Sequence, residues 1–227
     1  MSVKGTFHVT SQQNLAIKLE VGRRMPSVKL LNQSDARPWH FQELLKSNGS
    51  WRFVVFAGDI RNSRQKERLD QLGRDLGSPD SFIKRFTPAE ARYDAVFEVL
   101  VVHAAPRTSV TIFDFPEVFR QYHELDGYDY AKIFADDQSY HEGHGHLFEN
   151  FGIDPQEGCI VILRPDQYVS FVGSIDAYSE CDKFFSGFMM TQTHTVKGQE
   201  NKQMPQMHAP STMKTEANKA EGAAMVI

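Results

Sequence analysis

Two cysteines, Cys159 and Cys181, are the residues of this 227-residue chain whose chemistry depends most on their position. Thiol–disulfide exchange needs a thiolate at a helix N-terminus, usually within a C-x-x-C motif, because the helix dipole lowers the thiol pKa there. The expected turn from a strand at 51–57 into a helix reads AGDIRNSRQ and contains no cysteine. Cys159 begins an apolar run, and Cys181 lies on the apolar side of an expected helix. We therefore expect both thiols to pack in the core as small hydrophobic groups, and we exclude thiol–disulfide exchange.

The string HEGHGH brings His141, Glu142, His144 and His146 close together in the sequence. A loop that carries three imidazoles could hold zinc or iron. The spacing is not that of the helical H-E-x-x-H motif, however, and two glycines interrupt any helix through the string. The alternative is that the glycines shape a turn and the histidines cap a helix that begins near His146. We favour the turn and expect no metal site.

Asp136 and Asp137 are adjacent carboxylates that could be taken for an acid–base pair. On a strand, neighbouring side chains point to opposite faces, so the two groups could not act on the same substrate atom. We interpret them as the end of a solvated loop. A Ser-His-Asp triad is a spatial arrangement that one sequence does not show, so no catalytic residue is assigned.

Aromatic residues make up 11% of the chain and gather in two strings, DGYDYAKIFADD and ECDKFFSGFMM. In the second string, helical spacing puts Phe184 and Phe188 on one face and Phe185 about 100° away. A monomer buries one face of such a helix, and exposed apolar patches mark contact sites. These three phenylalanines are therefore the candidate interface, and we expect a homodimer or a heterodimer with a flavoenzyme. Ordinary core packing and a pocket for a flat hydrophobic molecule are the alternatives.

Apolar runs and helical periodicities alternate along the chain, as is typical of α/β proteins. Continuous apolar runs such as WRFVVFA indicate strands that are buried on both faces. The order of strand, helix, strand, helix, antiparallel hairpin and final helix predicts a thioredoxin-like fold, with a central mixed sheet flanked by helices. The expected strands cover 27–31, 51–57, 95–102, 132–135, 159–163 and 168–172, and the expected helices cover 63–76, 81–86, 116–123, 145–151 and 175–190.

A tight turn is expected at Arg164, Pro165 and Asp166, because proline at the second position of a turn has its φ already set. A second basic motif, Arg23 and Arg24, stands near the start of the expected body. Arginine side chains in such strings can fork onto carboxylates or carbonyls and fix one segment against another. We interpret these residues as structural ties, with anion binding as the alternative.

The segment 21–190 resembles one family through five strings taken together, VGRRMPSVKLL, DARPWHFQELL, FVVFAGD, SYHEGHGHLFENFGID and GCIVILRPDQYVSFVG. That family is the C-terminal thioredoxin-like domain of phenol 2-monooxygenases and related FAD-dependent aromatic hydroxylases. The resemblance implies a module that makes subunit contacts and lacks redox cysteines, whereas other domains of the whole enzymes bind flavin and substrate. This chain has no G-x-G-x-x-G motif after a strand, and its Gly58-Asp59 pair is expected to end a strand. We therefore expect no cofactor on this chain, with FAD only where a partner supplies it.

Three functions fit these observations. The first is a stand-alone dimerisation or accessory module for flavin-dependent hydroxylation of aromatic compounds, secondary metabolites included, that pairs with itself or with a flavoenzyme. The second is a truncated or split FAD-dependent monooxygenase. The third is a cofactor-independent catalyst of the isomerase or cyclase type on a repurposed thioredoxin-like scaffold. We favour the first function and leave open whether the chain is an enzyme.

Composition excludes several other classes of protein. The chain has 25 basic and 29 acidic side chains and no Lys/Arg-rich run, which argues against nucleic-acid binding. No apolar stretch reaches the roughly 20 residues that cross a bilayer, and no secretory signal is visible at the N-terminus. The low cysteine content suits a reducing cytoplasm. We expect an N-terminal arm at 1–20, a folded body at 21–190 and a disordered tail at 191–227.

Overall fold

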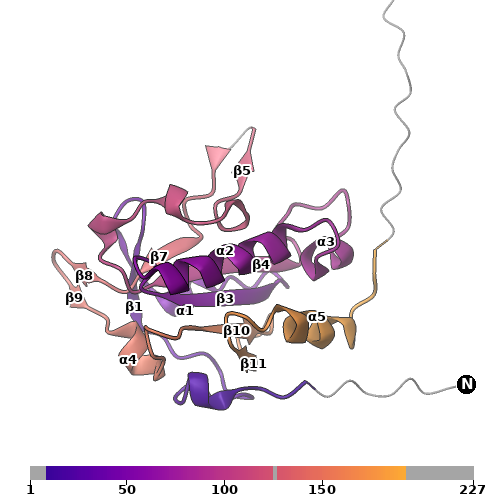
Figure 1. Ribbon diagram of the computed structural model, residues 1–227, viewed down its shortest axis with the longest axis horizontal. Helices are drawn as coiled ribbons and strands as arrows, with labels where there is room; N and C mark the ends of the chain where they lie inside the picture. The colour runs from indigo at the N-terminus through magenta and orange to yellow at the C-terminus, as the bar shows by residue number, and fades with distance from the viewer. Residues whose placement is uncertain (1–8, 125–126, 193–227) are drawn as a thin grey trace, which may run out of the picture. The chain divides into compact units, whose positions relative to one another are not determined.

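A seven-stranded mixed sheet forms the centre of the computed structural model, which describes residues 9–124 and 127–192 (Figure 1). The spatial order of its strands is β11-β10-β3-β4-β7-β1-β2. The middle strands β3, β4 and β7 run parallel, whereas the strands on either side pair antiparallel. The strands are β1 (Lys29–Asn32), β2 (Pro38–His40), β3 (Trp51–Gly58), β4 (Phe97–His103), β7 (Ile133–Ala135), β10 (Cys159–Leu163) and β11 (Val169–Gly173).

Both faces of the sheet are buried under helices, so the expected mixed α/β, thioredoxin-like arrangement is confirmed. Successive side chains of a strand alternate between faces. On β3, Phe53 and Val55 accordingly join the core under α2, α3 and α5, while Val54 and Phe56 join the core under α1 and α4. This two-sided burial explains why the strand reads as one apolar run. The helices are α1 (Phe41–Leu44), α2 (Ser63–Gly77), α3 (Phe82–Phe86), α4 (Leu147–Phe151) and α5 (Tyr178–Ser186).

The longest helix, α2, begins at Ser63 as predicted and ends at Gly77, one residue beyond the expected end. The Asn62 side chain accepts a hydrogen bond from the Arg64 amide at 3.0 Å, which caps the first turn. Leu69, Leu72 and Leu76 are buried on one face, as their spacing predicts.

Other segments differ from the prediction. The helix expected at 116–123 is a short 3-10 turn, η4 (Glu117–Phe119), followed by the strand β5 (Tyr122–His123). The final helix, α5, is shorter than the expected 175–190 and ends with Gly187 as its C-terminal cap, a residue of low helix propensity. Strand β2 and helix α1 were missed, since elements of three and four residues show no periodicity.

Two small ladders stand apart from the main sheet. Strand β5 pairs with β6 (Gly127–Tyr128), and β8 (Gln138–Ser139) pairs with β9 (Gly143–His144). In Figure 1 the strand β5 lies at the upper edge of the described ribbon, beyond α2 and away from the sheet.

Residues 9–20, expected as an arm outside the body, pack against the sheet. The Gln12 amide donates to the Val172 carbonyl at 2.8 Å, so this segment covers part of the edge strand β11. Ala16 and Leu19 are buried. Covering an edge strand hides backbone groups that would otherwise pair with another chain. The folded body therefore includes these residues.

The expected tail at 191–227 lies outside the described residues apart from 191 and 192. The Gln192 amide donates to the Arg85 carbonyl at 2.7 Å. Within 9–124 and 127–192, no helix has the length and apolar character needed to cross a membrane.

Candidate functional site

The turn between β3 and α2, where a redox thiol would stand, holds a glycine and an ion pair. Gly58 has φ +69°, and a Cβ there would lie 2.1 Å from the Pro155 carbonyl oxygen, so only glycine fits. Asp59 pairs with Arg61 at 2.6 Å, and this hydrogen bond lowers the pKa of Asp59. The glycine ends β3, as expected for the Gly58-Asp59 pair.

Both cysteines lie away from that turn. Cys159 begins β10 and Cys181 lies in α5, and both thiols are unpaired and fully buried. Burial raises the pKa of each thiol, so the protonated, unreactive form is favoured. The structure therefore places the two cysteines in the core, as the sequence predicted.

The HEGHGH loop is organised by a carboxylate. The Asp136 side chain accepts hydrogen bonds from the Leu147 and Phe148 amides at 2.9 and 3.0 Å, so it caps α4. His146 occupies the cap position with φ +50° but makes no side-chain capping bond, and His144 Nδ1 accepts from its amide at 2.8 Å. Asp136 and not an imidazole therefore caps the helix, while His144 satisfies the amide of the residue at the cap position.

The neighbouring Asp137 accepts a hydrogen bond from the Arg107 amide at 2.7 Å. The side chain of Asp136 is only 8% exposed. Both carboxylates therefore hold backbone amides of neighbouring segments in place. The interpretation of Asp136 and Asp137 as the end of a solvated loop was wrong. In the part of the chain that the structure describes, no three His, Cys, Asp or Glu side chains are arranged to hold a metal ion.

The two arginine motifs lie side by side at the end of the β10–β11 hairpin. Arg24 donates to the Gln167 side chain at 2.7 Å, and the Val169 amide donates to the Arg23 carbonyl at 2.8 Å. The side chain of Arg23 itself pairs with Glu20 at 2.6 Å and is mostly exposed. The backbone and Arg24 thus join the two segments.

The turn itself follows the predicted pattern. The Gln167 amide donates to the Arg164 carbonyl at 2.8 Å across Pro165 and Asp166, and Gln167 has φ +72°. The Arg164 side chain pairs with the Asp166 carboxylate within the turn. The guanidinium therefore engages its own turn.

The three phenylalanines of the candidate interface have different environments. Phe185 is fully buried, and its ring centroid lies 4.8 Å from that of Phe97. Phe184 is partly buried against Trp51, and Phe188 is 52% exposed with its ring 5.2 Å from the same tryptophan. Phe185 therefore belongs to the core and cannot form part of a contact surface. Phe188 has about half of its side chain exposed and could contact another molecule.

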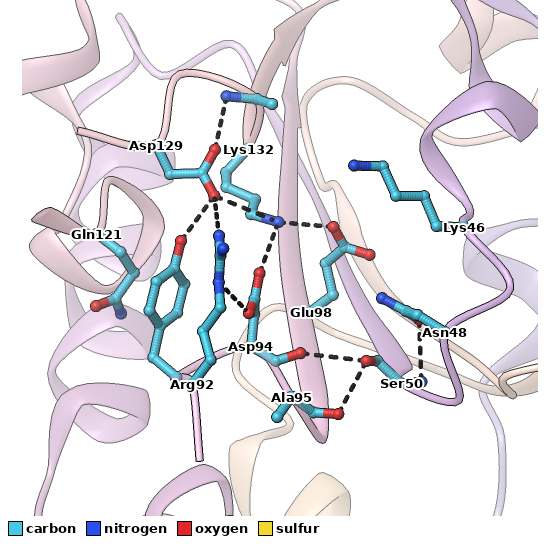
Figure 2. A network of polar contacts seen from close by, with 12 residues as sticks. Lys46, Asn48, Ser50, Arg92, Asp94, Ala95, Glu98, Gln121, Asp129 and Lys132 are labelled. Atoms are coloured by element: carbon cyan, nitrogen blue, oxygen red, sulfur yellow. Dashed lines mark hydrogen bonds and ion pairs between the residues drawn. The ribbon is translucent and has the colours of Figure 1, made fainter. Parts of the chain in front are cut away.

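A buried network of charges, which the sequence analysis missed, lies on β3, β4 and the start of β7. Arg52 on β3 pairs with Glu98 on β4 at 3.0 Å, and Lys132 pairs with the other Glu98 oxygen at 2.6 Å. Figure 2 shows the Lys132 ammonium between the carboxylates of Glu98, Asp94 and Asp129. The signal in the sequence was one charged residue inside each of two apolar strands, WRF and FEV.

A tyrosine and an arginine extend this network toward the surface. The Tyr93 hydroxyl donates to Asp129 at 2.7 Å, and Arg92 pairs with Asp94 at 2.8 Å. The loop that precedes β4 is thereby tied to the segment between β6 and β7. The Tyr93–Asp129 bond thereby holds the segment that carries Tyr128 and Tyr130 close to Tyr93.

None of the shifted groups in this network changes protonation near neutral pH. Burial works to lower the pKa of Lys132, but the charges of Glu98, Asp129 and Asp94 outweigh it and raise that pKa. Burial works to raise the pKa of Asp129, but the Tyr93 hydrogen bond and the Lys132 charge lower it. Burial and the bond to Asp129 raise the pKa of Tyr93. These shifts favour the charged forms of Lys132 and Asp129 and the protonated form of Tyr93, so the contacts that hold the two loops together are stabilised.

Beside the network lies a pocket of about 1110 Å³ with aromatic walls. Trp39, Tyr93, Tyr128 and Tyr130 line it, and two of these come from the string DGYDYAKIFADD that the sequence analysis singled out. Such a pocket can receive an apolar or aromatic group.

Exposed aromatic rings continue from the pocket onto the β5–β6 hairpin. The ring of Tyr128 lies 5.6 Å from Phe113, 5.1 Å from Tyr122 and 6.4 Å from Tyr130. The exposed fractions of Phe113, Tyr122 and Tyr130 are 62%, 58% and 54%. We call Phe113, Tyr122, Tyr128 and Tyr130 together the hairpin aromatic surface. A contiguous set of exposed rings of this kind is typical of a contact surface.

Comparison with known proteins places the chain in one class, the C-terminal domains of phenol hydroxylases. Residues 2–193 match the family described as "Phenol hydroxylase, C-terminal dimerisation domain", and the chain belongs to this family. The chain is 36% identical over 195 residues to the FAD-dependent monooxygenase terD of Aspergillus terreus, covering 84% of this chain and 30% of that protein. It is 32% identical over 181 residues to the 3-hydroxybenzoate 4-monooxygenase of Comamonas testosteroni, covering 79% of this chain and 28% of the relative.

The chain thus spans about 30% of the length of the curated relatives it matches. Among solved structures, the peroxidoxin BcpB of Mycobacterium tuberculosis is similar with a TM-score of 0.45 and 15% identity, over 73% of this chain and 95% of that one. Yeast Sco1 with copper bound is similar with a TM-score of 0.42 and 12% identity, over 72% and 93%.

Proposed function

We propose that this chain is a non-redox dimerisation module that serves FAD-dependent hydroxylation of aromatic compounds. The observation that carries the proposal is the match to a dimerisation-domain family over residues 2–193. The cysteine-free turn between β3 and α2 and the buried, protonated thiols argue against a redox role. The curated relatives include an FAD-dependent monooxygenase, a phenol 2-monooxygenase and a 3-hydroxybenzoate 4-monooxygenase, which supports a connection of the module to aromatic hydroxylation.

Self-association is the first property to test. Sedimentation velocity of the 227-residue protein over nanomolar to micromolar concentrations should show a species of twice 25.9 kDa, without a flavin absorbance spectrum. A 25.9 kDa species throughout this range would overturn self-association.

The accessory role needs a separate experiment. When the tagged chain is purified from cells that also express a flavoenzyme, the flavoenzyme should copurify with it. The flavin absorbance should then be found in the fractions that contain the flavoenzyme. If the isolated chain is itself yellow with stoichiometric flavin, the proposal that FAD comes only from a partner is wrong.

A further inference from the structure

We propose that the aromatic pocket, the hollow of about 1110 Å³ beside the charge network, binds a flat, uncharged aromatic molecule that carries a hydroxyl group. Trp39, Tyr93, Tyr128 and Tyr130 stand in its walls. This inference goes beyond the proposed function, because it gives the module a ligand site of its own and does not depend on self-association. It also gives a role to the string DGYDYAKIFADD, which supplies two of the four rings.

The walls and the volume of the pocket suit a flat ring system. The four rings come from segments far apart in the sequence, namely the edge strand β2, the loop before β4 and the segment that contains and follows β6. The volume lies at the upper end of the range for small-molecule sites, so a molecule of more than one fused ring can enter. Aromatic rings prefer offset-stacked or edge-to-face contacts, which add to the gain from burying apolar area.

Two of the walls are held in place by hydrogen bonds within the chain. The Tyr93 hydroxyl donates to Asp129 at 2.7 Å, which fixes the Tyr93 ring. The Asn32 side-chain amide donates to the Tyr130 carbonyl at 2.7 Å, which fixes the backbone that carries the Tyr130 ring. A site that is already ordered loses less conformational entropy when a ligand binds.

Polar groups with unused hydrogen-bonding capacity line the same pocket. In the part of the chain that the structure describes, the side-chain hydroxyls of Ser34 and Tyr130 have no hydrogen-bond partner. Asp35 accepts from the Arg37 amide at 2.9 Å through Oδ1, which leaves its other carboxylate oxygen for a further donor. These groups can both donate to a ligand and accept from it. A ligand hydroxyl combines the two complementary properties in one group.

The charges of the lining argue against an anionic ligand. More acidic than basic side chains line the pocket, with Asp35 and Asp129 among the acidic ones. The Arg92 guanidinium, which also lines the pocket, already pairs with Asp94 at 2.8 Å. A carboxylate ligand would therefore be repelled by Asp35, whereas an uncharged ring avoids this repulsion.

Trp39 provides a spectroscopic signal from the pocket wall. Its indole packs against the core under α1 and α4, and the Arg37 guanidinium lies 4.5 Å from the ring centroid. Its Nε1–H is enclosed and has no hydrogen-bond acceptor among the described residues. The chain has two tryptophans, so its NMR spectrum should contain two indole N–H signals, which Trp51→Phe assigns. An aromatic ring bound beside Trp39 should shift the Trp39 signal and leave that of Trp51 unchanged.

Three probes with the same carbon skeleton separate the requirements of the site. In isothermal titration calorimetry, 2-naphthol should bind with a Kd on the order of 100 µM, as expected of a small ligand. The compound 2-naphthoate has the same rings with a carboxylate, and decahydro-2-naphthol has the hydroxyl without aromatic rings. Each of these two should bind at least about 10-fold more weakly than 2-naphthol. The indole signals of isotope-labelled protein show where each probe binds.

Substitution of a wall ring locates the site. Tyr130→Ala removes a ring that is 54% exposed and should raise the Kd of 2-naphthol by about 10-fold or more. Tyr140→Ala is the matched control, because this tyrosine is 93% exposed and lies outside the pocket lining, so Kd should change less than about 2-fold. Circular dichroism and the melting temperature establish that both variants are folded.

A charge substitution tests the preference for an uncharged ligand. Asp35→Asn keeps an oxygen that can accept from the Arg37 amide but removes the negative charge. The Kd of 2-naphthol should stay within about 3-fold of the wild-type value, and the Kd of 2-naphthoate should fall toward it. A 2-naphthoate Kd that does not change in this variant would contradict the charge argument.

The outcomes separate this site from self-association. If 2-naphthol does not bind the folded protein, the ligand site is overturned, while sedimentation velocity decides self-association independently. Equal affinity for 2-naphthol and decahydro-2-naphthol, equal effects of Tyr130→Ala and Tyr140→Ala, or a shift of the Trp51 signal in place of Trp39 would overturn the site as well. Dissociation of a wild-type dimer by 2-naphthol would show that a second copy occupies the pocket, and would overturn the ligand role.

Discussion

Arg52 and Glu98 are register partners on the parallel strands β3 and β4, and their side chains form an ion pair of 3.0 Å inside the protein. The guanidinium is fully buried and also donates to the carbonyls of Ser50 and Lys46. The second carboxylate oxygen of Glu98 accepts from Lys132 at 2.6 Å. Burying these charges is tolerated because each one has an opposite charge and further hydrogen bonds.

Removing one member of this network should destabilise the fold strongly. Glu98→Gln leaves the buried Arg52 and Lys132 cations without their shared carboxylate, and we expect a loss of about 3–5 kcal/mol in the free energy of unfolding. Urea denaturation measures this loss. The control is Glu157→Gln, whose side chain is 47% exposed and pairs with Arg64 at 3.7 Å, where the change should stay within about 0.5 kcal/mol. Equal effects of the two substitutions would contradict the role of the network.

His103, at the end of β4, should make stability depend on pH. Its ring is fully buried, Nε2 lies 2.9 Å from Gln33 Oε1, and burial lowers its pKa from 6.5 to about 4. Between these values the unfolded chain binds a proton that the folded chain does not. The free energy of unfolding should therefore fall as pH falls from 6.5 to about 4, by up to about 1.4 kcal/mol per pH unit from this group.

The variant His103→Gln should flatten that part of the profile, even if it is less stable overall. Urea midpoints at intervals between pH 7 and pH 4 measure the slope. His141→Gln, at an exposed histidine, serves as the control and should keep the wild-type slope. A His103→Gln profile that parallels the wild type would show that this histidine does not drive the acid sensitivity.

The strands and the long helix could be predicted because their causes are local. Cys159–Leu163 matches the expected strand residue for residue, since a continuous apolar run flanked by a turn has few other solutions. The hairpin turn at Arg164 to Gln167 followed from proline and its neighbours for the same reason. The position of the cysteine-free turn before α2 could also be predicted, because it follows from the order of strands and helices along the chain.

The contents of the site could not be predicted, because they depend on pairing between distant residues. Arg52 and Glu98 are 46 residues apart, and Tyr93 and Asp129 are 36 apart. Helical spacing placed Phe185 on a different face from Phe184 and Phe188, but it does not show that all three rings contact Trp51 or that Phe185 is the fully buried one. The string DGYDYAKIFADD showed an excess of aromatic residues, yet only the fold shows that they form a pocket wall.

Asp136 should contribute to stability through the cap of α4. Asp136→Ala removes the acceptor for the Leu147 and Phe148 amides, so we expect a loss of about 1–2 kcal/mol in the free energy of unfolding. His141→Ala, an exposed change in the same loop, should cost much less. Thermal and urea unfolding of both variants provide the measurement. A larger loss for the histidine than for the aspartate would restore the imidazole as the group that organises this loop.

The two thiols should remain inert in the folded protein. Cys159 on β10 pairs in register with Phe56 on β3, and the side chain of Cys181 on α5 lies in the core. Burial raises the pKa of both, so thiolate is scarce and the sulfur atoms are closed to reagents. We expect no reaction with Ellman's reagent until denaturant unfolds the chain, when two thiols should react, and no reduction of insulin disulfides.

The variant Arg61→Cys supplies the matched positive control, because it places a thiol in the turn before α2 at a side chain that is 51% exposed. That thiol should react at once in the folded protein, which shows that the reagent reports exposure. Rapid labelling of the wild-type chain at a comparable rate, or reduction of insulin by it, would contradict the buried thiols and with them the non-redox assignment. Slow labelling that follows the urea unfolding curve would instead confirm that the two cysteines react only when the core opens.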